Sequence, residues 1–393
     1  MKQVVIVDNI RTGLAKAFRG TFNLTRADDM LAHCINALLA RNPTLDPALV
    51  DDVIAGAARQ TGEQSANIAR HAVALSRLPV TASAMSLSRA CASGLNAIAV
   101  AAQQIACGCG DVAIAGGVES ISGLERGRSE FAENPRLLTE LSQFLMPMGE
   151  TAEIVATRYR IGRERQDAYA LQSQQRYAAA VDAGYVSDEI APMTVIWRRE
   201  DRKDGTAEVL KGTVDRDECN RPGTTLDALT ALAPVFREDG TVTAGNASQL
   251  SDGASMTLLM SETAAARLGI QPLAYFRGFA VAGCEPDEMG IGPVFAIPKL
   301  LKRHGLAMQD VDLVELNEAF ASQCLYCRDA LDIDNGLFNV NGGAIAIGHP
   351  YGMTGSRMTG VLLRELRRRS KKLGIVSMCV GKGMGAAALF EAC

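Results

Sequence analysis

Short runs of β-branched and small apolar residues alternate with longer amphipathic stretches along most of the chain. An apolar run of about four to eight residues bounded by turn residues is typical of a buried strand, and apolar positions three or four apart indicate a helix. Because strands and helices alternate, the sequence predicts an α/β fold with a mixed or parallel sheet covered by helices. The expected strands lie at 4–7, 53–57, 112–115, 313–316 and 374–379, and the expected helices at 29–41, 92–106, 297–304 and 355–369.

This alternation is interrupted between about 119 and 248. The segment has little strand signal at first, then a helical stretch at 150–182 and a charged, turn-rich passage that begins at Arg198. The alternation resumes near Asn246, so we interpret the segment as a domain inserted into the first half. The predicted units are an N-terminal half (1–119 plus 246–270), an inserted loop domain (120–245) and a C-terminal half (271–393).

The two halves resemble each other. A shift of about 262 positions brings the glycine-rich turn around Cys91 close to Met353, and each turn leads into an apolar helix and then a strand. Segments 38–41 and 50–54 likewise echo 300–303 and 311–314. Two similar halves packed about a pseudo-twofold axis would let residues from corresponding turns share one site.

Composition narrows the classes of function. The chain has 393 residues and a formal net charge of −4, and its basic runs are short, which argues against a nucleic-acid or membrane-surface protein. No apolar stretch is long and clean enough to span a bilayer, so we expect no membrane insertion. Ten cysteines spread through a large chain are typical of reduced thiols rather than a disulfide framework, which predicts a cytoplasmic location.

Cys91 is the first candidate for chemistry. The residues from Ala92 to Ile105 are almost all apolar or small, so the helix there is expected to be buried on most sides, with Cys91 at its N-terminus. Unpaired N–H groups and the positive end of the helix dipole stabilise a thiolate, which predicts a lowered pKa. The alternative is a cysteine that serves as a small core residue.

Three further candidates lie near strand ends or in glycine-rich turns of the second half. His349 follows a glycine-rich passage and precedes Pro350, where glycine lets the backbone approach a ligand. Cys379 opens a glycine-rich loop whose N–H groups could face an oxyanion. Asn317 directly follows a strand, a usual place for α/β sites. The pairs Cys107/Cys109 and Cys324/Cys327 lack the four ligands of a zinc site, so no metal is expected.

These blocks resemble the signatures of the thiolase family. Cys91-Ala-Ser-Gly, the segment 339–355 around Gly348-His-Pro, Cys379-Val-Gly-Lys-Gly-Met-Gly and Asn317-Glu-Ala-Phe match in the family's order. Gly116-Gly-Val-Glu-Ser and neighbouring stretches also match, so the resemblance covers essentially the whole chain. It implies the thiolase fold, which has two βαβαβαββ halves in a five-layer α-β-α-β-α arrangement, with an inserted loop domain that holds coenzyme A.

The resemblance also implies roles for the matching residues. Cys91 would carry the acyl group, His349 would take its proton, and Cys379 would exchange a proton with the α-carbon of acetyl-CoA. One oxyanion hole would use the His349 ring and a water held by Asn317. The other would use the N–H groups of Cys91 and Gly381. The implied reaction is the reversible cleavage of a 3-oxoacyl-CoA into acyl-CoA and acetyl-CoA.

Coenzyme A is then a substrate, and no cofactor is implied. The matching positions are Arg221 near the adenine, Ser248 near the pantetheine arm and Met148 beside the acyl pocket; surface roles are the alternative for Arg221 and Ser248. Pro147 stands where many biosynthetic members have His, and the stretch 120–147 looks shorter than in tetrameric enzymes. We therefore expect a degradative enzyme that is a homodimer, with a homotetramer as the alternative. Lys382, in the Cys379 loop, is expected to point into solvent.

Other readings remain. Within the family a biosynthetic acetoacetyl-CoA thiolase is the main alternative. Ketoacyl-carrier-protein synthases share the fold, but they use His or Asn where this chain has Cys379. A non-catalytic acyl-CoA or lipid-binding protein on the same fold would be expected to lack one of the four catalytic groups.

Overall fold

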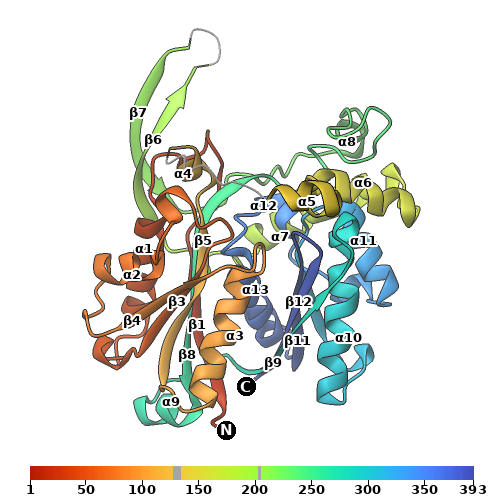
Figure 1. Cartoon of the computed structure of the whole chain (residues 1–393). Helices are drawn as coiled ribbons and strands as arrows, with labels where there is room; N and C mark the ends of the chain where they lie inside the picture. Colours follow the sequence, from red (N-terminus) through yellow and green to blue (C-terminus); the bar gives the residue numbers. More distant parts are fainter. Residues whose placement is uncertain (127–133, 202–204) are drawn as a thin grey trace.

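The structure, a computed structural model, describes residues 1–126, 134–201 and 205–393. The first half of the chain supplies one set of strands with the helices that cover them (Figure 1). Its elements are β1 (Val4–Arg11), β2 (Ala15–Lys16), α1 (Ala27–Arg41), β3 (Asp52–Gly56), α2 (Ile68–Leu75), β4 (Ser83–Leu87), α3 (Ser93–Ala106), β5 (Val112–Glu119), β8 (Ser251–Ser261) and α9 (Glu262–Leu268).

The second half supplies the elements that carry Asn317, His349 and Cys379. They are β9 (Ala274–Gly283), α10 (Gly292–His304), β10 (Leu313–Leu316), α11 (Ala321–Ala330), α12 (Ala344–Ile347), α13 (Thr354–Arg368), β11 (Leu373–Val380) and β12 (Met384–Ala392). Short 3-10 helices occupy Pro47–Leu49, Gly62–Gln64, Ser142–Leu145, Pro286–Ile291, Met308–Asp310 and Asn335–Leu337.

The strands of the two halves follow the same order. In the first half the order across the sheet is β1-β8-β5-β3-β4, and in the second it is β9-β12-β11-β10. The second half has no fifth strand among the described residues, and a single parallel bridge from Val314 to Phe338 stands in its place. The half-sheets join edge to edge through β1 and β9, which pair only at Val5 with Tyr275 and Ile6 with Ala274.

Five layers result, because each half-sheet has helices on both faces. Helices α1 and α2 cover the outer face of the first half-sheet, and α10 and α11 cover that of the second. Helices α3 and α13 lie between the half-sheets and pack against each other, as Figure 1 shows. Alternate strand residues decide the face: Val53 points to α1 and α2, whereas Ile54 points to the central layer. The predicted α/β thiolase fold is confirmed.

The segment between β5 and β8 adds helices and a long hairpin to one end of this core (Figure 1). Its elements are α4 (Ile121–Arg126), α5 (Pro135–Glu140), α6 (Met148–Arg158), α7 (Arg163–Asp182), β6 (Met193–Glu200), β7 (Ala207–Val214) and α8 (Leu226–Thr230). β6 and β7 pair only with each other among the described strands. The expected division at 120–245 stays a prediction. The shortened stretch predicted at 120–147 partly lies outside the described residues, because it includes 127–133.

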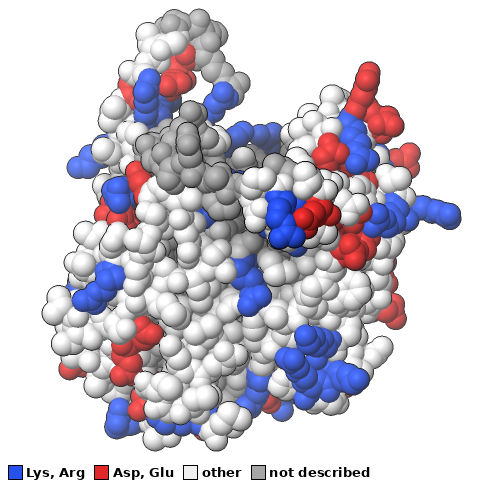
Figure 2. All heavy atoms as spheres, viewed as in Figure 1, with Lys and Arg blue, Asp and Glu red and all other residues white. Residues whose placement is uncertain are grey.

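The surface agrees with the balanced composition. Figure 2 shows basic and acidic side chains interspersed over one face, with a basic group over α10, whose last turn carries Lys302, Arg303 and His304. In the described part of the chain, no helix is both long and apolar enough to cross a membrane. All ten cysteines are free thiols.

Candidate active site

Cys91 lies in a tight turn between β4 and α3. Ala90, the residue before it, has a φ of 43°, which is in the left-handed region that residues other than glycine rarely adopt. The Ser93 hydroxyl holds this turn, since it donates to the Ala90 carbonyl oxygen at 2.6 Å and accepts from the Arg89 N–H at 2.9 Å. The turn places a half-buried Cys91 two residues before Ser93, the first residue of α3.

The Cys91 thiol contacts the loop that joins β11 to β12. Burial raises the pKa of the Cys91 thiol to about 11, hydrogen bonding from the Gly381 N–H opposes the rise, and the negative charge of Glu119 adds to it. The N–H of Cys91 itself also faces the sulfur. Our expectation of a lowered pKa was therefore wrong, because desolvation outweighs the N–H donors at the helix start.

His349 is buried, and two hydrogen bonds fix its ring. Its Nδ1 lies 2.7 Å from Thr354 Oγ1, and the Thr354 hydroxyl donates to the Pro350 carbonyl oxygen at 2.9 Å. Because the Thr354 proton is committed to that carbonyl, Thr354 Oγ1 must accept from His349, which assigns the ring proton to Nδ1. Nε2 therefore carries the lone pair, and it lies 3.2 Å from Asn317 Nδ2.

The environment keeps His349 neutral. Burial lowers the pKa of His349 to about 3, and the positive charge of Arg357 acts in the same direction. A neutral ring with its lone pair on Nε2, where Asn317 Nδ2 is the neighbouring donor at 3.2 Å, can accept a proton once that bond is released. The Oδ1 atom of Asn317 is buried as well and has no hydrogen-bond partner among the described residues. Asn317 thus retains an acceptor beside Nε2, which suits a polar ligand or a water molecule.

Cys379 lies near the end of β11 and is fully buried. It packs with Met289 and Ala319, and the partly buried Met148 and Phe320 contact the same group. Burial raises the pKa of the Cys379 thiol well above its usual range, and a charge on Cys91 would raise it further. The two cysteines are thus electrostatically coupled, and Cys379 faces an apolar wall.

The His349 loop is fixed against the first half of the chain. The Gly348 φ of 99° favours glycine, and a side chain there would collide with Ser251 Oγ. The His349 N–H donates to the Gln249 carbonyl oxygen at 3.0 Å. At the start of α3, a Cβ added to Gly94 would lie 2.6 Å from the Gly352 carbonyl oxygen. The small residues of both turns therefore allow the halves to meet beside Cys91.

Family models match both halves of the chain. The thiolase N-terminal domain matches residues 4–263 and the thiolase C-terminal domain matches residues 270–392. The chain belongs to the thiolase family.

Curated and solved relatives cover the chain from end to end. A 3-ketoacyl-CoA thiolase of Bacillus subtilis is 46% identical over 395 residues and covers 100% of both chains. The dimeric peroxisomal thiolase of Saccharomyces cerevisiae has a TM-score of 0.90 at 38% identity, over 100% of this chain and 97% of its own. Human mitochondrial 3-ketoacyl-CoA thiolase in complex with CoA has a TM-score of 0.88 at 40% identity, over 100% and 98%.

The remaining predicted residues of this thiolase lie at varied distances from the core of the site. The Ser248 N–H donates to the Ala319 carbonyl oxygen at 3.0 Å, so the Ser248 main chain lies beside the segment that follows Asn317. Arg221 is exposed, and its N–H donates to Gln174 Oε1 at 2.8 Å. Lys382 is exposed as expected, with its ammonium 4.9 Å from the centre of the Phe144 ring.

Two residues of this thiolase site were missed from the sequence. Thr354 fixes the His349 tautomer, and Glu119 accepts from the Gly352 N–H at 2.9 Å. Thr354 lies five residues after His349, within the matched segment 339–355, and Glu119 ends the matched stretch Gly116-Gly-Val-Glu. Spacing alone did not separate them from structural residues, because a helix start and a strand end usually carry polar residues.

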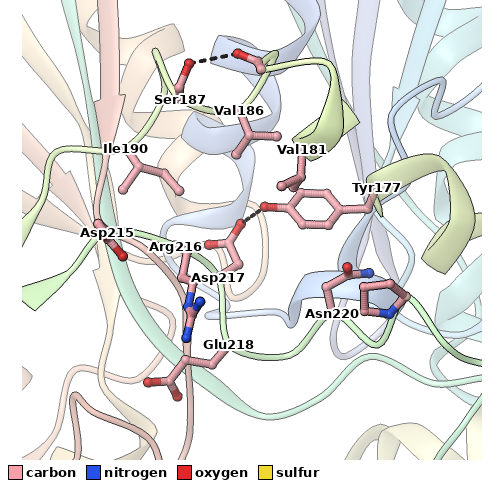
Figure 3. Close-up of a pocket in the computed structure, with 12 residues that line it drawn as sticks. Tyr177, Val181, Val186, Ser187, Ile190, Asp215, Arg216, Asp217, Glu218 and Asn220 are labelled. Carbon is pink, nitrogen blue, oxygen red and sulfur yellow. Dashed lines mark hydrogen bonds between the residues drawn. The ribbon is translucent and has the colours of Figure 1, made fainter. Parts of the chain in front are cut away.

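A separate cavity of about 550 Å³ lies outside the catalytic group of this thiolase (Figure 3). Its polar wall includes Asp217, which accepts from the Tyr177 hydroxyl and from two nitrogens of the buried Arg11 at 2.7 and 2.9 Å. Arg11 also pairs with Glu189 at 3.0 Å. Since these charges satisfy one another, we assign them a structural role, which is to join β1 to the inserted segment.

No group of three or more His, Cys, Asp and Glu in the described residues is arranged to hold a metal ion.

Proposed function

We propose that this protein is a degradative thiolase that reversibly cleaves 3-oxoacyl-CoA with coenzyme A to give acyl-CoA and acetyl-CoA. The observation that carries the proposal is the ring of His349, held by Thr354 with its lone pair on Nε2 and with Asn317 beside it. We propose that this ring exchanges a proton with the Cys91 sulfur, which faces the Gly381 N–H.

In the first half-reaction the Cys91 sulfur attacks the keto carbon of the substrate, and its proton passes to His349 Nε2. A raised thiol pKa means that the free enzyme holds Cys91 protonated, so a base must act during the attack. The bond between C2 and C3 then breaks. The acyl group stays on Cys91, and the electron pair leaves on the acetyl-CoA enolate.

We assign Cys379 the proton transfer at C2, the carbon that carries the electron pair of the enolate. Its thiol donates a proton to the enolate to form acetyl-CoA, which leaves a Cys379 thiolate. That thiolate takes the proton of an incoming coenzyme A, whose sulfur attacks the acyl group on Cys91. Acyl-CoA leaves, and His349 returns its proton to the Cys91 sulfur. The high pKa of Cys379 suits this role, because a weak acid becomes a strong base once ionised.

Each half-reaction creates an oxyanion. We assign one to a hole formed by His349 and a water held by Asn317, and the other to the N–H groups of Cys91 and Gly381. The orphaned Asn317 Oδ1 supports the first, and the two N–H groups that face the Cys91 sulfur support the second. Loss of one such donor typically costs about 3–4 kcal/mol of transition-state stabilisation.

The substrate is proposed from the apolar group beside Cys379. Met148 and Phe320 contact that group, and the Phe236 and Phe320 rings meet edge to face at 6.4 Å. These side chains suit acyl chains longer or bulkier than acetoacetyl, in keeping with relatives named 3-ketoacyl-CoA thiolases. Arg221 and Ser248 are proposed to bind coenzyme A, which is a substrate here, and we propose no cofactor.

Assembly and location belong to the same proposal. We infer a homodimer, in line with the dimeric yeast relative. β4, which leads into the Cys91 turn, is an edge strand on which Ser83 and Met85 are exposed, so a second copy could add to the sheet there. Free thiols throughout the chain support a cytoplasmic location. Light scattering that gives a stable tetramer would refute the dimer.

Acyl labelling tests the reaction. After brief incubation with acetyl-CoA and quenching, mass analysis should find the acetyl group on the peptide that contains Cys91. Cys379→Ser should keep this label but lose cleavage of 3-oxoacyl-CoA by several orders of magnitude. Cys107→Ser, which changes an exposed thiol, is the control and should behave as wild type. Label found only on another peptide, or near-normal cleavage by Cys379→Ser, would contradict the mechanism.

A further inference from the structure

The carboxylate of Glu119 accepts four hydrogen bonds from two halves of the molecule. Oε2 accepts from the N–H of Ala58 at 2.8 Å and from that of Gly352 at 2.9 Å. Oε1 accepts from the Arg59 N–H at 3.2 Å and from Gln64 Nε2 at 2.7 Å. Glu119 is the last residue of β5 and is fully buried.

All four partners are donors, which determines the state of the group. A protonated carboxyl would have to direct its own hydrogen at one of these N–H groups, so the arrangement requires the carboxylate. Each oxygen is used twice, so an amide at this position could satisfy only one of the two pairs. Burial raises the pKa of Glu119, and the Gln64 amide is the strongest of the contacts that oppose this.

The contacts join the segments on which Cys91 and His349 lie. Gly352 is three residues beyond His349, and its carbonyl oxygen faces Gly94 at the start of the Cys91 helix. We propose that Glu119 is a positioning residue for the proposed thiolase reaction. Its carboxylate fixes the Gly352 main chain, and with it the His349 loop, against the turn that carries Cys91, and its negative charge acts on the Cys91 thiol.

The electrostatics agree with this geometry. The charge of Glu119 raises the pKa of the Cys91 thiol, and Glu119 and Cys91 both raise the pKa of Tyr351, which burial raises first. Cys379 and Tyr351 are also coupled to the sulfur, His349 is the base proposed for its proton, and Arg59 opposes the effect on Tyr351. Glu119 is therefore the one carboxylate in the described residues whose charge acts on both.

Alkylation tests the proposal without any substrate. The rate at which iodoacetamide modifies Cys91, followed by peptide mass analysis as a function of pH, reports the thiol pKa. Glu119→Gln should move the midpoint of this profile down by about half a unit to one unit, so that alkylation at pH 8 becomes about three to ten times faster. Since no thiolase turnover is needed, this result stands or falls separately from the proposed reaction.

Glu153→Gln is the matched control. Glu153 is a buried carboxylate that accepts from the N–H groups of Thr241 and Val242 and from the Thr241 hydroxyl. The Glu153→Gln variant loses the same kind of hydrogen bonds, but Glu153 is not among the groups whose charge acts on Cys91. The midpoint of Cys91 alkylation in this variant should therefore equal that of wild type. Equal shifts in both variants, or no shift in Glu119→Gln, would overturn the proposal.

Gln64→Met provides a second variant that keeps the charge of Glu119, in case Glu119→Gln does not fold. It removes the Gln64 donor to Glu119, the bond from Gln64 to the Arg59 carbonyl oxygen and the bond from the Ser120 N–H to Gln64, but leaves the Gly352 contact in place. The alkylation midpoint should then not fall, whereas kcat for cleavage of a 3-oxoacyl-CoA should fall at least about fivefold at unchanged KM, because the carboxylate is held less firmly. An unchanged kcat, or a midpoint lowered as expected for Glu119→Gln, would overturn the positioning role.

Discussion

Thr354→Val removes the hydroxyl that fixes the His349 ring and leaves the shape of the side chain almost unchanged. Thr354 is fully buried, and its Oγ1 is 2.7 Å from His349 Nδ1 and 2.9 Å from the Pro350 carbonyl oxygen. Valine therefore leaves a buried N–H and a buried carbonyl without this partner. Two lost hydrogen bonds at about 0.5–1.5 kcal/mol each predict a loss of about 1–3 kcal/mol of unfolding free energy.

The catalytic loss has a different cause. Without Thr354 only the Asn317 amide, 3.2 Å from Nε2, still favours the proton on Nδ1, so part of the population carries it on Nε2 and cannot accept a proton from Cys91. We expect kcat to fall by about 10- to 100-fold, which is the usual effect of removing a group that orients a functional histidine. KM should change little, since Thr354 is buried behind the ring.

Thr359→Val is the matched control for this test. Thr359 is also fully buried on α13, and its hydroxyl makes a single hydrogen bond, to the Gly355 carbonyl oxygen at 2.9 Å. Chemical unfolding and steady-state cleavage of a 3-oxoacyl-CoA should be measured on both variants. The control should lose about 0.5–1.5 kcal/mol of stability and keep its kcat. If the two variants have the same kcat, the assignment of the His349 tautomer to Thr354 is wrong.

Three further outcomes are expected. The pKa of His349 is lowered to about 3, so the unfolded chain takes up this proton first as pH falls, and stability is lost from pH 6.5 toward pH 3. His349→Gln should therefore flatten the decline of the unfolding free energy over that range, by at most about 1.4 kcal/mol per pH unit, and an unchanged slope would contradict this. Gly348→Ala, which would collide with Ser251 at a φ of 99°, should lose more than about 2 kcal/mol, whereas Gly162→Ala, in open space, should change stability by less than about 0.5 kcal/mol. Met148→Ala should favour bulkier over shorter 3-oxoacyl-CoA substrates when kcat/KM is compared across a panel, and an unchanged order would remove Met148 from the acyl pocket.

Strands with apolar side chains on both faces were predictable from the sequence. The strand expected at 313–316 is β10 (Leu313–Leu316), and the helix expected at 92–106 is α3 (Ser93–Ala106). Burial on both sides leaves a continuous apolar run that needs no knowledge of partners. The edge strand β4 was not marked, because its half-exposed residues form no such run. β12 (Met384–Ala392) was not marked either, although it is buried. It is rich in alanine and becomes a strand through pairing with β9 and β11.

The candidate site divides in the same way. Residue types at glycine-rich turns and strand ends pointed to Cys91, Asn317, His349 and Cys379 without coordinates, because glycine, thiol and imidazole in such places have few structural uses. The sequence thus determined the fold class, the repeat and the chemical groups available for the reaction.

Only the tertiary structure decided the state of those groups. Helix position predicted a lowered pKa for Cys91, whereas burial and Glu119 raise it. The His349 tautomer depends on a Thr354 hydroxyl whose proton is already committed to a carbonyl. A pKa and a tautomer reflect the burial of a group and its distances to neighbouring charges and hydrogen-bond partners. Glu119 and Gly352, which are far apart along the chain, become neighbours only when the two halves pack.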